Sequence, residues 1–206
     1  MIQLVDKLEL PFFYGDRCLI IGGGPSIADM DWDEIRAFDG RTIAINEAGL
    51  TVDPNADIFY WCDWQWGQWN RDRYHLNKSP HRLTSAQGNI GEFGGTNYIH
   101  TENSVPFHTT GVQIAGRDSG TRCINLAYLC GIRQVYLIGF DMHDTPGRKG
   151  NFHDHHQQIP PGKTRSAYFV PAHTEMSKHL PNDFQVFNCT PDSALTCWPY
   201  MKWSTI

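Results

Sequence analysis

The chain has 206 residues, a formal net charge of −5 and 40% hydrophobic residues. This length is enough for a domain with a sizeable core, and the composition is that of a globular protein, not of a disordered one. The acidic balance disfavours a broad nucleic-acid-binding surface, because binding to phosphate backbones needs clustered lysine and arginine. A nucleic-acid acceptor held by a local patch stays compatible with it.

The cysteines and the hydropathy pattern bear on the cellular setting. The six cysteines show neither C-x-x-C spacing nor a Cys/His zinc pattern, and several lie inside apolar runs. We therefore expect free thiols and a reducing, cytoplasmic location. The charged N-terminal residues predict no signal peptide, and no run approaches the roughly 18 to 20 apolar residues of a membrane span. Oligomerisation is left open.

The first 65 residues alternate short apolar runs with helical or loop segments. Strands are predicted at residues 17–21, 42–46 and 57–61, with a helix at 26–38. The first strand is a continuous apolar run that ends in three glycines, which is typical of a strand buried on both faces of a parallel sheet. This alternation predicts a Rossmann-like, doubly wound α/β fold with a mostly parallel sheet.

The pattern is weaker in the middle of the chain and clear again after residue 118. We predict, in chain order, a helix at 66–74, strands at 82–84 and 97–99, a helix at 119–130, a strand at 134–139, a helix at 172–180 and a strand at 185–188. Residues 144–171 are rich in Pro, Gly, His and Lys and lack periodicity, which predicts a lid or disorder. Residues 1–206 are interpreted as one nucleotide-binding domain with this lid.

A glycine-rich turn follows the first strand and consists of Gly22, Gly23, Gly24, Pro25 and Ser26. Glycine lets the backbone approach a phosphate or ribose closely, and free N–H groups at a helix start attract anions. The turn has neither the G-x-G-x-x-G of dinucleotide sites nor the Gly-Lys-Ser/Thr of a Walker A loop. It predicts nucleotide binding, and the alternative is a tight turn that needs glycine only for its shape.

Polar residues stand at the carboxyl ends of three predicted strands, where ligands bind in open α/β sheets. The amide of Asn46 can donate to and accept from a base or ribose, or can cap the next turn. Asp63 has the same placement after the third strand. Asp141 and His143 follow the strand at 134–139, and we expect them to point into the same cleft.

Two helix starts complete the candidate site. Asp118, Ser119 and Gly120 open the helix at 119–130 and are interpreted either as a second phosphate- or sugar-facing turn or as an ordinary N-cap. His173 follows the predicted lid at another helix start. A histidine of near-neutral pKa in that position is a natural general base.

Two clusters keep alternative interpretations. The run His153, Asp154, His155 and His156, with His143 upstream, could bind a metal, but adjacent side chains diverge, so no metal site is predicted. The tryptophans between residues 61 and 69 either stack on a base or sugar or pack the core.

The order of these features resembles the bacterial sialyltransferases that use CMP-sialic acid, part of a superfamily with many short phage-encoded members. The matching segments are GGGPS at 22–26 for G-N-G-P-S, a strand ending at Asn46, Phe59-Tyr60, Asp118 to Gly120 for T-S-G, Gly131 to Asp141, His173-Thr174, and Cys189 to Leu195. The resemblance covers about residues 17 to 197.

The resemblance implies an inverting glycosyltransferase-like enzyme with a nucleotide-sugar donor of unspecified base and no metal requirement. His173 corresponds to the general base that deprotonates an acceptor hydroxyl. The glycine turn, Asn46 and Ser119 correspond to the nucleotide and phosphate site. His143 stands where the family has a tyrosine beside the leaving phosphate, and Gly23 stands where it has asparagine. The acceptor is a glycan, a small molecule or a modified nucleic-acid base.

Two other functions stay open. The superfamily also contains pterin pyrophosphokinases with a similar G-x-G-P-S start, which use ATP and magnesium and rely on aspartates. Asp63 and Asp141 would take that part here. The third alternative is a non-catalytic nucleotide-binding phage protein.

Overall fold

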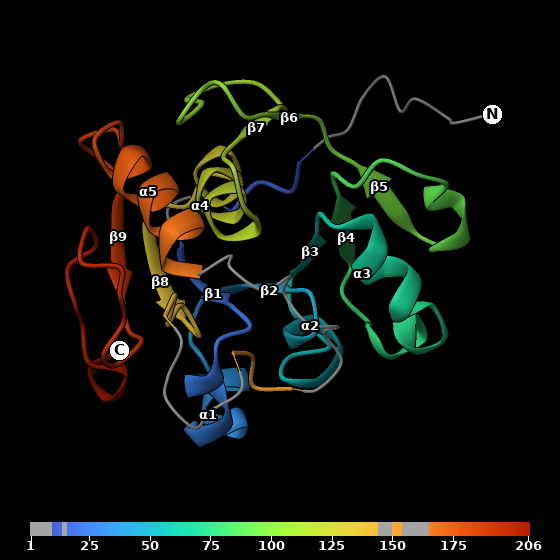
Figure 1. Ribbon diagram of the computed structural model, residues 1–206, viewed down its shortest axis with the longest axis horizontal. Helices are drawn as coiled ribbons and strands as arrows, with labels where there is room; N and C mark the ends of the chain where they lie inside the picture. Colours follow the sequence, from blue (N-terminus) through green and yellow to red (C-terminus); the bar gives the residue numbers. More distant parts are fainter. Residues whose placement is uncertain (1–9, 14–15, 144–149, 154–164) are drawn as a thin grey trace.

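The computed structural model describes residues 10–13, 16–143, 150–153 and 165–206. Seven strands form its central sheet, in the order β5-β4-β3-β2-β1-β8-β9 (Figure 1). They are β1 (Arg17–Ile21), β2 (Arg41–Ile45), β3 (Ile58–Trp61), β4 (His81–Thr84), β5 (Thr96–Tyr98), β8 (Gln134–Ile138) and β9 (Gln185–Asn188). Each neighbouring pair is parallel.

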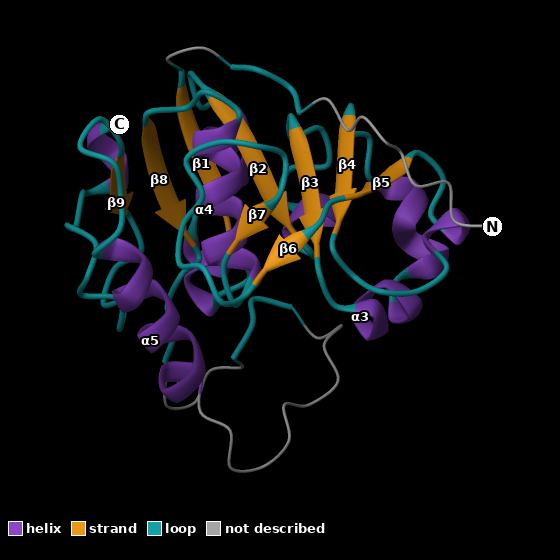
Figure 2. Ribbon diagram, turned by 90° about the horizontal axis from the view of Figure 1, so that it is seen from above, coloured by secondary structure: helices purple, strands orange, loops and turns teal. Residues whose placement is uncertain are grey.

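The chain builds this sheet in two directions from β1. It runs outward through β2 to β5 and then returns to place β8 on the other side of β1. The arrowheads in Figure 2 accordingly point to one edge of the sheet. A binding crevice is expected where the direction reverses, outside the carboxyl ends of β1 and β8.

Short helices cover both faces of the sheet. The α4 helix (Ser119–Leu129) and α5 (Arg165–Ser177) lie on one side in Figure 1, and α1 (Trp32–Arg36) and α2 (Ala48–Thr51) lie on the other. The remaining elements are α3 (Trp64–Trp69), the 3-10 helices η1 (Pro25–Asp29), η2 (Arg71–Leu76), η3 (Ile90–Glu92) and η4 (Trp203–Thr205), and the two-residue strands β6 (Thr101–Glu102) and β7 (Ile114–Ala115), which pair with each other.

The core follows the alternation of side chains along the strands. In β1, Cys18 and Ile20 pack into one hydrophobic cluster with α4, and Leu19 and Ile21 pack into another with Ile27 of η1. These four side chains are fully buried. Burial on both faces is what the continuous apolar run predicts for a parallel strand.

The tryptophan-rich segment contributes mainly to a third cluster. Trp61 and Trp66 are fully buried there with Phe59 and Phe93. Trp61 lies edge-on to Phe93 with ring centroids 4.9 Å apart. For these two tryptophans core packing is therefore the correct interpretation, whereas Trp69 faces the cavity described below.

The predicted Rossmann-like, mostly parallel fold is confirmed, but three helices differ from their predictions. The helix predicted at 66–74 is divided at Asn70 into α3 and the 3-10 helix η2. The helix predicted at 26–38 is interrupted, because Met30 is extended and the Asp31 side chain accepts from the Asp33 N–H, which starts a new helix. Residues 165–171, placed in the predicted lid, belong to α5. The rest of that lid, except residues 150–153, lies outside the described residues.

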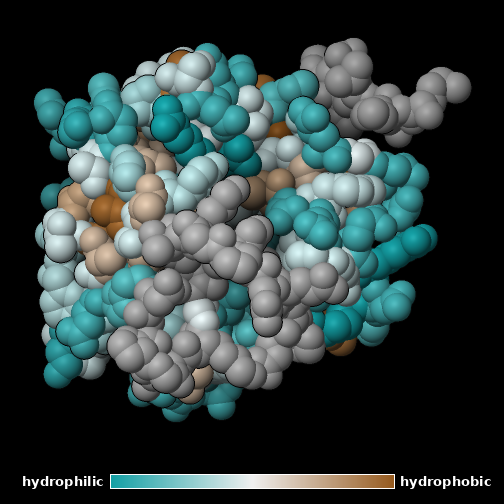
Figure 3. All heavy atoms as spheres, viewed as in Figure 1, coloured by the Kyte–Doolittle hydropathy of each residue, from teal (hydrophilic) through white to brown (hydrophobic). Residues whose placement is uncertain are grey.

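The described surface in the view of Figure 3 is largely hydrophilic, with hydrophobic residues gathered on its left. Within the described part of the chain, no helix combines the length and apolar character needed to cross a bilayer.

Candidate functional site

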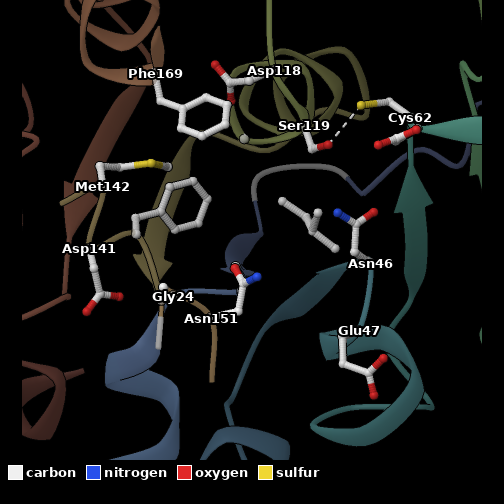
Figure 4. Close-up of a pocket in the computed structure, with 18 of the residues that line it drawn as sticks. Gly24, Asn46, Glu47, Cys62, Asp118, Ser119, Asp141, Met142, Asn151 and Phe169 are labelled. Carbon is white, nitrogen blue, oxygen red and sulfur yellow. Dashed lines mark hydrogen bonds between the residues drawn. The ribbon is translucent and has the colours of Figure 1, made fainter. Parts of the chain in front are cut away.

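A cavity of about 490 Å³ opens at the carboxyl ends of β1, β2 and β8 (Figure 4). The glycine turn, the start of α4 and the first half of α5 contribute to its walls. Of the predicted site residues, those that line it are Gly22, Gly23, Gly24, Pro25, Asn46, Asp63, Ser119, Gly120 and Asp141. Ser26, His143 and His173 are not among its lining residues.

Three backbone N–H groups of the glycine turn already donate hydrogen bonds within the protein. Gly22 donates to the Ile138 carbonyl and Gly24 to the Gly139 carbonyl, each at 2.8 Å. The Ser26 N–H donates to Oδ1 of Asp141 at 3.1 Å. The expectation that the turn's amides are free to bind an anion is therefore wrong for these three, since β8 and the residues after it already supply their acceptors.

The same close contacts explain why two of the three positions in the turn need glycine. A Cβ on Gly22 would lie 2.6 Å from the Gly139 oxygen, and one on Gly24 would lie 1.9 Å from Oδ2 of Asp141. A Cβ on Gly23 would meet, among the described residues, only Oδ1 of Asn151 at 3.9 Å. Gly22 and Gly24 are needed for close approach, whereas Gly23 leaves open space on the cavity wall.

Asp141 is held beside the glycine turn. Its Oδ2 accepts from the Ser26 hydroxyl at 2.7 Å, in addition to the Ser26 amide. Together these two residues border a second hollow of about 650 Å³, which His143 also lines. His143 Nε2 lies 2.7 Å from the Asp192 carbonyl. The structure therefore places His143 outside the 490 Å³ cavity.

The start of α4 forms the opposite wall. Asp118 is its N-cap and exchanges hydrogen bonds with Thr121 in a capping box. Burial alone would raise the pKa of the Asp118 carboxyl, but interaction with the His173 imidazole and hydrogen bonds from Thr121 hold that pKa below its usual value. The Ser119 hydroxyl lies 2.9 Å from the Cys62 thiol (dashed in Figure 4). With Ser119 and Gly120 on the wall, the positive end of this 11-residue helix borders the cavity.

Asn46 lies on the wall in an unusual backbone conformation. Its φ of 53° is in the left-handed region that asparagine tolerates better than most residues. Its N–H donates to the Tyr60 carbonyl, which ends β2. The side-chain Oδ1 is buried and has no hydrogen-bond partner among the described residues. Such an acceptor is costly unless a water or ligand satisfies it.

His173 lies deep in the protein and is fully buried. Its Nδ1 accepts from Nε1 of Trp198 at 3.1 Å, and its Nε2 lies 3.5 Å from Oδ1 of Asp118. A Cβ on Gly120 would lie 3.2 Å from that Nε2, so the ring sits directly behind the start of α4. The role of general base stays a prediction, because it requires an imidazole nitrogen that can reach the cavity.

Several lining residues were not predicted. Glu47 is 1% exposed and pairs with the Arg73 guanidinium through contacts of 2.8 and 2.5 Å. Tyr168 and Phe169 reach the cavity from α5. Glu47 follows Asn46 directly, so the strand-end argument applied to it too, whereas nothing in the composition of residues 144–171 marked the two aromatic residues.

The wall carries more negative than positive charge. Its described lining residues include the carboxylates of Glu47, Asp63, Asp118 and Asp141, and Arg117 is the only lysine or arginine among them. Asp63 caps α3 by accepting from the Gln65 N–H at 2.9 Å. Glu47 is neutralised by its ion pair, so the remaining carboxylates are those that the sequence places at strand ends and at the start of α4.

The described residues contain no group of three or more His, Cys, Asp or Glu side chains arranged to hold a metal ion. His153 lines the cavity, but Asp154, His155 and His156 lie outside the described residues. All six cysteines are free thiols, as the sequence predicts.

Comparison with known proteins gives one informative similarity. No protein-family profile and no curated protein sequence matches the chain. The fold is similar to that of a solved structure, the MAf glycosyltransferase from Magnetospirillum magneticum AMB-1, with a TM-score of 0.66 and 15% sequence identity. The match covers 95% of this chain and 35% of that one, so this chain spans about a third of its length. At this identity the similarity establishes the fold.

Proposed function

We propose that the 490 Å³ cavity binds a nucleotide-sugar donor and that the protein transfers the sugar to an acceptor hydroxyl. The observation that carries this proposal is the placement of the cavity at the reversal point of a parallel sheet, against the start of α4. The similar fold of a glycosyltransferase supports the class of reaction. The sialyltransferase-like order of motifs supports it independently.

In this proposal the leaving phosphate binds at the start of α4. The Ser119 hydroxyl and the backbone amides of Ser119 and Gly120 lie at the positive end of a helix, which attracts anions. Arg117 adds a full positive charge on the same wall. The unpartnered Oδ1 of Asn46 would accept from a ribose hydroxyl or a base N–H, and Phe169 would pack against an apolar face of the donor.

Inverting transfer needs a base that removes the acceptor proton while the phosphate leaves. The sequence assigns this step to His173. In the described geometry that step requires the ring to separate from Trp198 or Asp118 and to become accessible.

One observation favours a second candidate function. Asp63, Asp118 and Asp141 outnumber the single arginine on the wall, and carboxylates with a diphosphate are the usual ligands of Mg²⁺. A magnesium-dependent pyrophosphoryl transfer from ATP therefore stays the alternative. In that case, binding needs the divalent cation and is specific for ATP.

Calorimetric titration with a panel of CMP-, CDP-, UDP- and GDP-sugars and ATP, with magnesium or with EDTA, tests the proposal. The decisive variant is Gly23→Leu, which places a side chain in the open space of the cavity. Gly94→Leu is the matched control, because a Cβ there meets nothing within 4 Å among the described residues and Gly94 does not line the cavity.

We expect at least one sugar nucleotide to bind wild type and Gly94→Leu equally, and Gly23→Leu at least 10-fold more weakly. If ATP binds only in the presence of magnesium and no sugar nucleotide binds, the result would support the pyrophosphokinase alternative and overturn the first proposal. Equal binding by all three proteins would place the ligand elsewhere.

A further inference from the structure

The environment of His173 is unusual for a proposed proton acceptor. The ring is fully buried and lies edge-on to both Phe140 and Trp198, with interplanar angles of 84° in each pair. Its two nitrogens face different groups, the Trp198 indole on one side and the Asp118 carboxylate on the other. Nε2 makes no hydrogen bond of normal geometry with the described part of the chain.

The chemistry of the indole settles which nitrogen carries the proton. An indole N–H can donate a hydrogen bond but cannot accept one. Trp198 Nε1 lies 3.1 Å from His173 Nδ1, so Nδ1 must present its lone pair. In a neutral imidazole the single proton then sits on Nε2, directed at Asp118.

Protonating the ring is opposed by the same contact. An imidazolium would carry N–H groups on both nitrogens, and the one on Nδ1 would face the indole N–H at 3.1 Å. Two donors at that distance repel each other and leave both without an acceptor in a buried site. The gain on the other side is an ion pair with Asp118 at 3.5 Å, longer than a normal hydrogen bond.

We propose that Trp198 is a positioning residue that holds His173 in the neutral tautomer with its proton on Nε2. His173 then directs an N–H at the Asp118 carboxylate, which caps α4, and so helps to fix the helix start that borders the cavity. In this tautomer Nε2 has no lone pair with which to accept a proton from an acceptor hydroxyl. The assignment of the tautomer does not depend on the proposed function. Only the effect of the tautomer on catalysis rests on that function.

The direct test is nitrogen-15 NMR of the histidine side chains in the intact protein, with His173 assigned by its loss in His173→Gln. We expect a neutral ring protonated on Nε2 in wild type. Trp198→Phe removes the indole N–H and should shift His173 toward the other tautomer or a mixture. Trp66→Phe is the matched control, because Trp66 is also fully buried but its indole N–H has no partner in the described residues.

Three results would overturn the inference. They are an imidazolium in wild type, a wild-type ring protonated on Nδ1, and a His173 spectrum that is the same in Trp198→Phe as in wild type. If Trp198→Phe does not fold, the wild-type tautomer alone still decides between the inference and its rejection.

A second measurement separates positioning from catalysis once a donor is known. Glutamine at position 173 retains an N–H that can reach Asp118 but cannot act as a base at neutral pH. A positioning role predicts a smaller loss of kcat in His173→Gln than in His173→Ala, which has no N–H for Asp118, whereas loss of a general base lowers kcat about 10² to 10⁴-fold in both variants. A loss of that size with an unchanged Kd for the donor would return His173 to the role of base. If no donor is found, the proposed function fails but the NMR result stands.

Discussion

Alanine substitutions at two adjacent glycines should have opposite effects on stability. A Cβ on Gly24 would lie 1.9 Å from Oδ2 of Asp141 and 2.6 Å from the Gly139 backbone oxygen. Gly24→Ala must therefore displace the Asp141 carboxylate from Ser26. A Cβ on Gly23 has its nearest described neighbour at 3.9 Å, which is ordinary contact.

The magnitude follows from the two hydrogen bonds that Gly24→Ala breaks. Asp141 accepts both of them from Ser26, at 3.1 and 2.7 Å. Hydrogen bonds to charged groups contribute about 1.5 to 3 kcal/mol each, and partial relaxation recovers some of that. We expect Gly24→Ala to lower the free energy of unfolding by about 3 kcal/mol. Gly23→Ala should be neutral or stabilising by about 0.4 to 1 kcal/mol, because alanine restricts the unfolded chain.

Urea denaturation monitored by tryptophan fluorescence measures both free energies of unfolding. The expected decrease in Gly24→Ala corresponds to a Tm about 6 to 12 °C lower. The reasoning is refuted if the two variants have the same stability, or if Gly23→Ala is the less stable one.

Three further predictions concern ionisable groups. Burial raises the pKa of Cys130 and Cys189 to about 12, against about 8.5 in an unfolded chain, so their contribution to stability is present below pH 8.5 and lost as pH rises toward 12. In urea unfolding from pH 8 to 11, the free energy of unfolding should fall less steeply in the variant with both Cys130→Ala and Cys189→Ala than in wild type. The same slope in both proteins would contradict this prediction. The pKa of Asp118 is lower in the folded protein than in the unfolded chain, so its ionised carboxylate stabilises the fold above about pH 3.9, and this stabilisation is lost as pH falls through the folded pKa. Asp118→Asn should therefore be less stable than wild type at pH 7, by a difference that shrinks in acid. A difference that does not change with pH would contradict this reasoning. Glu47→Gln should lower the free energy of unfolding by about 2 kcal/mol in the same assay. The decrease is smaller than for a fully buried ion pair because Arg73 is 28% exposed. No measurable decrease would show that the ion pair does not stabilise the fold.

The fold could be predicted because the central strands are continuous apolar runs. Residues 17–21 and 134–138 form neighbouring inner strands of the sheet, and all but the first residue of each are buried, so hydrophobicity reveals them. The helix at 26–38 was predicted wrongly because its apolar residues fit a helical spacing, whereas the cap at Asp31 is a local hydrogen bond that periodicity does not detect.

The candidate site could be predicted only in part, for a physical reason. Asn46 and Ser119 reach the cavity because strand ends and helix starts of a parallel sheet converge, which is a property of the topology. The partners of buried polar groups depend on distant segments. Trp198 lies 25 residues beyond His173, and no local pattern shows that its indole occupies Nδ1.

The same limit applies to the glycine turn. The sequence predicts close backbone approach at residues 22–24, and the structure shows that two of these glycines approach β8 and Asp141 instead of a ligand. The acceptors that occupy the amides come from about 115 residues further along the chain. Which partner a glycine accommodates is therefore decided by tertiary packing.

A crystal structure of the protein with the sugar nucleotide that binds most tightly tests the central proposal most directly. We predict that its phosphate lies within hydrogen-bond distance of the Ser119 and Gly120 amides, with part of the donor over Gly23 and a polar atom on Oδ1 of Asn46. A donor bound in the second hollow beside His143, or an empty cavity at saturating concentration, would contradict the proposal.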